Sequence, residues 1–204
     1  GVTGVQTCAL PIYKTENTGW EKALLLYLHD LICMLMAILL IFLIFFRIIV
    51  VSGDSMYSTL VDGDYVLLLN NLFYPDPKQG DIVVISKQSF DNGSPIVKRV
   101  IATEGQTVDI DEMTATVYVD GISLEETYIN TPTTHSGTTQ FPLVVEEGCL
   151  FVMGDNRGVS LDSRDQRIGQ VDKREVLGKT IYLMIPGSNH GMEQPDKTRM
   201  GEIE

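Results

Sequence analysis

The sequence predicts a mostly β protein, an antiparallel β-sheet domain that follows one N-terminal transmembrane helix. The uncharged run LICMLMAILLIFLIFF (31–46) predicts the helix. Beyond Val51, short runs of β-branched and aromatic residues alternate with Gly, Pro, Asn and Asp, the pattern of strands and turns. No stretch after Val51 repeats its apolar residues at the helical period, so we expect little helix there.

The charge of the chain limits its partners. The 204 residues carry a formal net charge of -12. The whole acidic excess lies after Val51, because acids and bases balance before it. This argues against nucleic acid, which is bound by clustered Lys and Arg. The three Cys and three His show no metal-site spacing, so we expect no metal and no cofactor.

The first residues do not look like native protein. Residues 1–12, GVTGVQTCALPI, lack an initiator methionine and resemble the conceptual translation of a sequencing-library adaptor. We expect them to be an assembly artefact, with a genuine disordered N-terminus as the alternative, and resequencing the locus distinguishes the two. Residues 13–23 then form a short N-terminal segment.

Residues 24–51 are expected to form a transmembrane anchor. The uncharged run has 16 residues and reaches 21 if the Arg47 guanidinium rises to the interface, against the ~20 that a bilayer requires. Two alternatives fit less well. A cleaved signal peptide would need a small-residue cleavage site after the run, and FFRIIVVSGD offers a poor one. A buried core helix is possible, but it would be apolar on all sides in a small protein. Lys14 and Lys22 precede the run, so the positive-inside tendency places the domain outside the cytoplasm in a single-pass protein of the cell membrane.

Residues 52–187 are expected to form one β-rich domain. The predicted strands are 65–69, 81–86, 95–102, 107–110, 116–119, 149–153 and 180–185. Asp120-Gly121, between two such runs, predicts a two-residue hairpin turn, which needs positive φ at both positions. We expect a polar loop at 130–140 and a solvated polar tail at 188–204.

Lys98 is the candidate for a catalytic base. A serine hydroxyl is a weak nucleophile and needs a base, but no histidine here has suggestive neighbours. In PIVKRVIA, strand alternation puts Ile96 and Val100 on the face of Lys98, and partial desolvation would lower the pKa of its amine. From strand position alone, a solvent-facing lysine is the simpler interpretation.

A third segment, GDNRGVSLDSRDQRIG (154–169), is dense in turn formers, acids and arginines. By itself it fits a charged loop held by its own ion pairs. It also fits a weak calcium loop, although it lacks the terminal Glu and the spacing of one.

Three segments taken together resemble bacterial type I signal peptidases, membrane-anchored Ser/Lys endopeptidases that remove signal peptides from exported preproteins. The segments are VSGDSMYSTL (51–60), IVKRVIATEGQTVDI (96–110) and VMGDNRGVSLDSR (152–164). Their order and spacing and the preceding helix also agree, over about residues 24–187. The short, single-anchor Gram-positive form fits better than the larger two-anchor form. The resemblance implies preprotein signal peptides and the lipid bilayer as partners.

By this resemblance Ser55 is the nucleophile, Lys98 is the general base in its neutral form, and Ser160 orients the Lys98 amine. The Ser55 backbone N–H supports the oxyanion. Part of the family adds a serine side chain two positions earlier, where this chain has Gly53. The residues expected to form structural ion pairs are Arg99, Asp155, Arg157, Asp162 and Arg164. The substrate binds as an added β-strand, against pockets that prefer alanine. The expected lining residues are Ile49, Val51, Met56, Leu60 and Val97.

One residue departs from the family pattern: Ser58 stands where proline is usual. Proline fixes φ but performs no chemistry, so we still expect activity, with Ser58 and Ser52 as rival hydroxyls. Two other functions stay open. The first is a self-cleaving repressor of the DNA-damage response, another Ser/Lys protease, which the predicted anchor argues against. The second is a membrane-tethered, non-catalytic β domain that binds a protein partner. A preprotein cleavage assay distinguishes this second function from the protease.

Overall fold

The computed structural model describes residues 19–88, 90–187 and 196–203. The chain divides into two compact units after Phe42. The expected artefact at 1–12, and residues 13–18 of the segment that follows it, lie outside the described residues.

The helix α1 (Gly19–Phe45) has 27 residues, which at ~1.5 Å per residue gives a length of about 40 Å. By length and composition it is able to cross a membrane. None of its residues is buried in the structure, which argues against a core helix.

The structure corrects the expected bounds of the anchor, 24–51. The helix α1 begins at Gly19 and ends at Phe45, and the next residues form strand β1 (Phe46–Val50). Strand β1 pairs antiparallel with β2 (Tyr65–Asn70), from Phe46 opposite Leu69 to Val50 opposite Tyr65. The sequence misleads here because a β-branched apolar run suits a membrane helix and a sheet edge equally well.

The larger sheet has eight strands and carries the candidate site. Its order is β1-β2-β11-β3-β4-β9-β10, with β12 paired to β11, and every pair is antiparallel. The strands after β2 are β3 (Ile82–Ile85), β4 (Ile96–Thr103), β9 (Cys149–Met153), β10 (Val171–Asp172), β11 (Val176–Ile185) and β12 (Gly201–Glu202). Among the described residues, four short 3-10 helices connect elements: η1 (Asn71–Phe73), η2 (Asp91–Gly93), η3 (Lys173–Glu175) and η4 (Lys197–Arg199).

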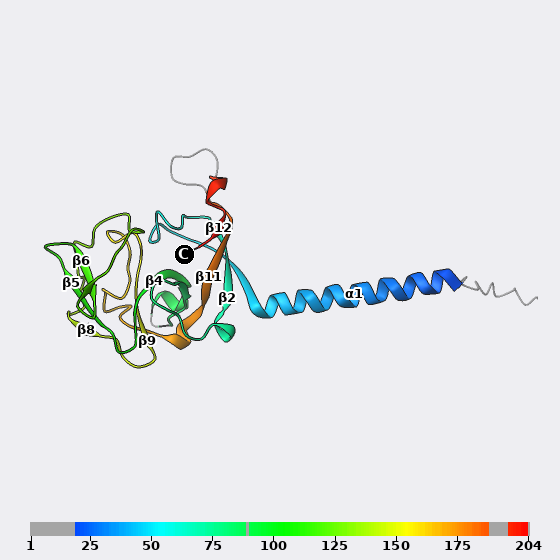
Figure 1. Cartoon of the computed structure of the whole chain (residues 1–204), viewed down its shortest axis with the longest axis horizontal. Coiled ribbons are helices and arrows are strands. Elements are labelled where there is room, and N and C mark those ends of the chain that lie inside the picture. Colours follow the sequence, from blue (N-terminus) through cyan, green and yellow to red (C-terminus); the bar gives the residue numbers. More distant parts are fainter. Residues whose placement is uncertain (1–18, 89, 188–195, 204) are drawn as a thin grey trace, which may run out of the picture. The chain divides into compact units, whose positions relative to one another are not determined.

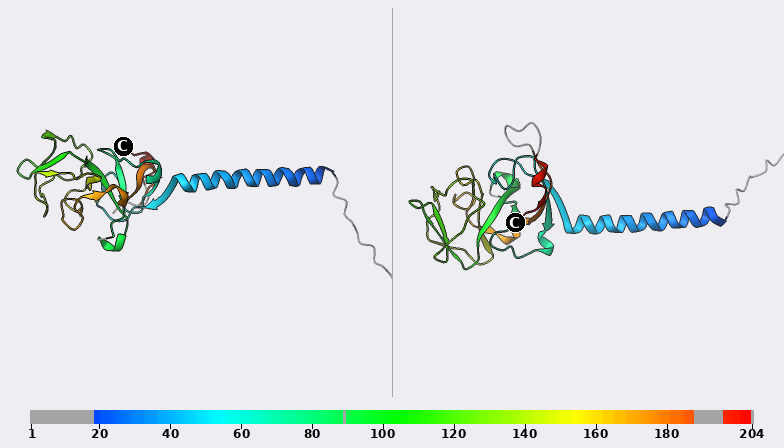
Figure 2. Two further views of the ribbon diagram at one scale, coloured as in Figure 1. Left: turned by 90° about the horizontal axis from the view of Figure 1, so that it is seen from below. Right: turned by 45° about the horizontal axis from the view of Figure 1, so that its top comes forward.

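The smaller sheet has the order β7-β6-β5-β8 and lies beside β9, at the opposite end of the domain from β2 (Figures 1 and 2). Its strands are β5 (Thr107–Asp111), β6 (Thr116–Val119), β7 (Ile122–Ser123) and β8 (Leu143–Val144). The predicted hairpin turn is confirmed, because Asp120 and Gly121 have φ of 54° and 78° and join paired strands.

All seven predicted strands are confirmed. The second strand of the predicted hairpin is β7. The strands missed, apart from β1, are the two-residue strands β8, β10 and β12, which are too short to show a period of two.

The core consists of three apolar clusters. One joins Met56 and Leu60, from the loop between β1 and β2, to the inner residues of β2, β3 and β4. A second lies between the two sheets, and a third covers the other face of β3, β4 and β9. Met56 and Leu60 are 1% and 0% exposed, so each stabilises the loop's position by roughly 1.5–3 kcal/mol.

The C-terminal tail differs from the expectation of a solvated 188–204. Residues 188–195 lie outside the described residues, but η4 and β12 fold against the domain, and β12 pairs with β11. Ile203 packs on the first core cluster. The partners of this segment lie far away in the sequence, so its polar composition alone did not show the contacts.

Candidate active site

The loop of residues 51–64 lies between β1 and β2 and carries Ser55. We call it the nucleophile loop because Ser55 is the predicted nucleophile. Buried Met56 and Leu60 flank the serine on its C-terminal side, and Leu60 N–H donates to Met56 O at 2.9 Å. The Gly53 N–H donates to Asp62 Oδ1 at 2.8 Å. Gly53 has φ of 84°, a conformation that favours glycine. Packing and local hydrogen bonds therefore hold Ser55 half-buried at the surface of the domain.

Lys98 reaches this loop from β4. Its Nζ donates a hydrogen bond of 2.7 Å to Ser55 Oγ. Lys98 is 3% exposed, so the interpretation as a solvent-facing lysine is wrong. Burial lowers the pKa of the Lys98 amine to about 8, against the opposing charges of Asp162 and Asp155. At pH 7 about one in ten of these amines is therefore neutral, far more than for an ordinary lysine.

An apolar pocket of about 290 Å³ opens beside the two side chains. Besides Ser55 and Lys98 it is lined by Ile49, Val50, Ser52, Pro95, Ile96 and Val97. Of the predicted lining residues, Ile49 and Val97 are present in it. Val51, Met56 and Leu60 do not line it. They are almost fully buried in the first core cluster, to which Val97 also belongs. Alternation along the chain placed Ile96 on the face of Lys98, but it did not reveal that Pro95 also lines this pocket.

The two rival hydroxyls lie on the same loop as Ser55. Ser52 is exposed at the pocket lining, and Ser58 is exposed on the loop. The hydroxyl that accepts from Lys98 belongs to Ser55.

The five charged residues expected to form ion pairs do so in buried positions. Arg99 donates through Nε and Nη2 to the two oxygens of Asp155, each at 2.9 Å. Arg164 binds Asp162 in the same two-point manner at 2.8 and 2.9 Å. These four residues are at most 6% exposed, so their charges are satisfied by each other.

Arg157 finds a partner that the sequence did not suggest. It pairs with Glu126, with Nη1 3.0 Å from Oε2, and also donates to Thr133 Oγ1 at 2.7 Å. Nearby, the Arg99 guanidinium carbon lies 4.0 Å from the centroid of the Tyr128 ring. The stretch 124–133 carries no motif, so sequence reasoning had no signal for these residues.

Asn156 is a further residue that sequence reasoning missed. Its N–H donates to Ser55 O, and its Nδ2 donates to Asp54 O, both at 3.0 Å. The third segment therefore holds the backbone of Ser55 and of the residue before it. In the sequence, Asn156 was recognisable only as a turn-forming residue of that segment, which does not indicate a contact with Ser55.

Ser160 does not make the hydrogen bond that the resemblance implied. Its Oγ is buried and makes no hydrogen bond to any described residue, so the expected contact with the Lys98 amine is absent. The hydroxyl lies instead against Gly154, where an added Cβ would collide with Ser160 Oγ and come within 2.5 Å of Ser55 O. Ser160 and Ser55 are thus brought together over a glycine.

Gly154→Ala is expected to reduce activity by at least about tenfold and stability by roughly 1–3 kcal/mol, because the new methyl displaces the Ser55 backbone. The matched control is Gly158→Ala, whose Cβ would meet only Thr131 Oγ1, at 3.5 Å. Enzyme kinetics and urea unfolding of both variants check this. Equal activity in the two would contradict the tight fit.

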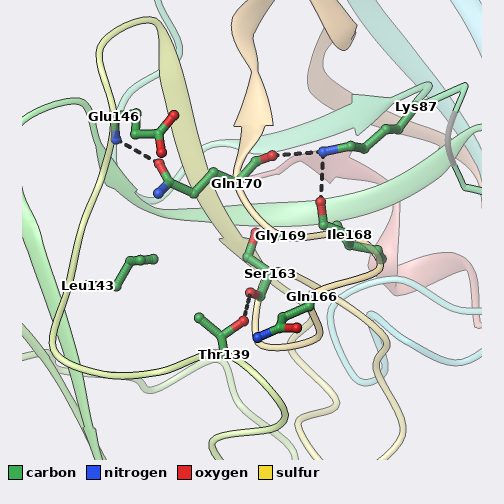
Figure 3. Close-up of a pocket in the computed structure, with 9 residues that line it drawn as sticks. All are labelled: Lys87, Thr139, Leu143, Glu146, Ser163, Gln166, Ile168, Gly169 and Gln170. Atoms are coloured by element: carbon green, nitrogen blue, oxygen red, sulfur yellow. Dashed lines mark hydrogen bonds between the residues drawn. The ribbon is translucent and has the colours of Figure 1, made fainter.

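A second cavity, of about 380 Å³, is lined by none of the predicted site residues. Figure 3 shows Lys87 donating across it to Ile168 O at 2.7 Å and Gln170 O at 2.8 Å. These bonds tie the end of β3 to the chain that follows Arg164. Across residues 19–88, 90–187 and 196–203, no three His, Cys, Asp or Glu side chains gather as a metal site.

The site combines a serine hydroxyl that is hydrogen-bonded to a buried lysine with an adjacent pocket on an antiparallel β domain. This arrangement is typical of serine hydrolases that use an amine as base. Residues 24–185 match the family described as signal peptidase, peptidase S26. The chain belongs to this family, as the three sequence segments predicted.

Named relatives match half to most of the chain. It is 36% identical over 150 residues to a probable signal peptidase I-1 of Synechocystis sp., covering 69% of this chain and 72% of that protein. It is 32% identical over 181 residues to signal peptidase I of Bacillus licheniformis, covering 85% and 95%. A crystal structure of a signal peptidase I from Enterococcus faecalis is 34% identical, with a TM-score of 0.43 over 51% of this chain and 96% of that one. Family membership and α1 together are consistent with a membrane-anchored enzyme.

Proposed function

We propose that this protein is a signal peptidase I, an endopeptidase that cleaves signal peptides from exported preproteins at the outer membrane surface with Ser55 and Lys98. The family match and the relatives' names support the activity. The single observation that carries the residue roles is the 2.7 Å contact between Lys98 Nζ and Ser55 Oγ, made by a buried amine.

In the proposed mechanism, neutral Lys98 takes the Ser55 proton as Oγ bonds to the scissile carbonyl carbon. The carbonyl oxygen becomes an oxyanion, and the Ser55 N–H donates to it. The C–N bond then breaks, and Lys98 gives its proton to the departing amine. Water, deprotonated by Lys98, next attacks the carbonyl carbon of the acyl-serine ester. The bond from this carbon to Oγ breaks, Lys98 returns its proton to Ser55 Oγ, and the acid product leaves as a carboxylate.

The pocket beside Ser55 is proposed to receive the small side chain that precedes the scissile bond. Ile49 and Val97 supply apolar walls, and the pocket is closed on one side by the loop that holds Ser55. A substrate in extended form would bind by main-chain hydrogen bonds, with side-chain selection by the pocket.

The buried ion pairs are proposed to hold the site in shape and not to react. Arg99 follows Lys98 directly, so its two hydrogen bonds to Asp155 fix the part of β4 that carries Lys98.

The anchor is proposed to hold the whole site near the membrane. Ser55 lies ten residues after the end of α1, at most ~35 Å of extended chain, so the site stays near the membrane that α1 is proposed to cross. The domain is proposed to lie outside the cytoplasm.

The proposal is tested with the full chain in detergent and a preprotein whose signal peptide ends in alanine at the −1 and −3 positions. We expect one cut after the −1 alanine, located by mass spectrometry. Replacing that alanine by phenylalanine should reduce kcat/KM by at least about tenfold, because the substrate pockets of signal peptidases prefer alanine. No cut in the alanine substrate would favour the non-catalytic β domain, and equal rates for both substrates would refute the pocket's role.

A further inference from the structure

We propose that Arg199, in the C-terminal segment 196–203, is a positioning residue for the nucleophile loop, so that full activity depends on this segment. The inference rests on the proposed function of Ser55. Arg199 does not touch Ser55 or Lys98; it acts through Asp64 and Thr59.

The contacts of Arg199 are those of a two-point clamp. Its Nη2 donates to Asp64 Oδ2 at 2.8 Å and to Thr59 O at 3.1 Å, and its Nη1 donates to Asp64 Oδ1 at 3.2 Å. The planar guanidinium suits this geometry because it presents several N–H groups in a fixed fork. One side chain thus holds two points of the nucleophile loop.

Asp64 is the buried end of the clamp. Its side chain is 0% exposed, against 19% for that of Arg199. Its oxygens also accept from Val61 N–H at 2.8 Å and from Gly187 N–H at 2.7 Å. Without Arg199, this carboxylate would be left buried with backbone donors and no opposite charge from the C-terminal segment. Leaving a buried charge unpaired is strongly unfavourable, so we expect the loop to shift or open.

Thr59 connects the clamp to the catalytic side chains. Its carbonyl accepts from Arg199, while its Oγ1 donates to Asp155 Oδ2 at 2.5 Å. Asp155 in turn binds Arg99, the neighbour of Lys98 on β4. The nucleophile loop is therefore held from one side by Arg199 and from the other by the strand that carries the base.

The segment that carries Arg199 is itself seated on the domain. Strand β12 pairs with β11, with Glu202 opposite Tyr182 and Gly201 opposite Leu183, and lies along it in Figure 1. Ile203 packs on the core cluster that includes Met56 and Leu60. The segment thus contacts the same loop through charge at Arg199 and through packing at Ile203.

The test compares Arg199→Ala, Arg199→Lys and the control Lys197→Ala, which removes an exposed positive charge from the same 3-10 helix. All are assayed as full chains in detergent below their unfolding temperatures. In Arg199→Ala we expect kcat to fall about ten- to a hundredfold with KM changed less than about threefold, since misplacement affects the chemical step more than binding. Lys197→Ala should match wild type. Arg199→Lys should recover part of kcat, because an ammonium pairs with Asp64 but lacks the fork.

Two further readouts separate positioning from a general loss of stability. Millimolar guanidinium should restore part of kcat in Arg199→Ala and leave Lys197→Ala unchanged. Hydrogen exchange should become faster at the loop amides of Tyr57, Leu60 and Val61, while amides of β4 and β9 keep their protection. A uniform increase across the domain would overturn the proposal, as would wild-type kcat in folded Arg199→Ala.

The outcomes for Arg199 and for the proposed function are distinguishable. If the wild-type protein cleaves and Arg199→Ala cleaves equally well, the clamp alone is refuted. If the wild-type protein does not cleave, the proposed function is refuted, and hydrogen exchange still decides whether Arg199 holds the loop.

Discussion

Ser55→Ala is expected to abolish signal peptide cleavage while the protein stays folded. The Ser55 oxygen is the proposed nucleophile, and loss of a nucleophilic serine in such enzymes reduces kcat by roughly 10⁴-fold or more. The side chain is half-buried and small, so its removal should change the unfolding free energy by no more than about 1–2 kcal/mol. Cleavage assays and urea unfolding measure the two effects.

Ser58→Ala is the matched control for this variant. Ser58 is an exposed serine three residues later on the same loop, and the hydrogen bond from Lys98 goes to Ser55. We expect Ser58→Ala to cleave at the wild-type rate. Cleavage by Ser55→Ala, or its loss in Ser58→Ala, would move the nucleophile to another hydroxyl.

Lys98→Met is expected to reduce kcat by about 10³-fold or more. In the proposed mechanism the Lys98 amine makes every proton transfer, and methionine has no group that replaces it. In the wild-type protein, kcat/KM should rise with pH and level off above about 8, the pKa to which burial lowers the Lys98 amine. At pH 7 such an amine is neutral about one time in ten, whereas an ordinary lysine would be neutral about once in three thousand. A profile that is flat from pH 6 to 10, or a Lys98→Met variant as active as wild type, would refute the base.

The same variant should become more stable at neutral pH. The Lys98 pKa falls from 10.5 in the unfolded chain to about 8 in the folded protein, so the unfolded chain binds more protons between these values. Stability therefore rises with pH through that window, and the penalty is fully present below about pH 8. At pH 7, Lys98→Met removes the cost of burying the charged amine, up to about 3 kcal/mol of unfolding free energy. The lost hydrogen bond to Ser55 reduces this gain by about 1 kcal/mol. The gain should disappear above pH ~10.5, as urea unfolding at both pH values would show.

Local patterns predicted much of the domain correctly. Residues such as Ile82–Ile85 and Cys149–Met153 are rich in β-branched and aromatic side chains and form central strands. The Asp120-Gly121 turn was predictable because few dipeptides tolerate positive φ at both positions. Phe46–Val50 was not, because its apolar character suits lipid and sheet alike, and the choice depended on whether β2 was available as a partner.

The predicted site residues divide in the same way. Ser55 and Lys98 stood out through short motifs, and the structure brings them into hydrogen-bond contact. Met56 and Leu60 were assigned to the pocket but belong to the core. Their role depends on which way the loop turns after Ser55, which no local pattern reports.

The sequence alone determined the family, the strands with a clear period and the two side chains proposed for catalysis, because each is written in consecutive residues. Only the tertiary structure decided that Glu126 neutralises Arg157, that Asn156 holds the Ser55 backbone and that Arg199 closes on Asp64. These contacts join residues that are far apart in the chain, from 31 positions for the first to 135 for the last. A buried charge takes whichever opposite charge the packed chain brings to it, and that choice is made by folding rather than by neighbours in sequence.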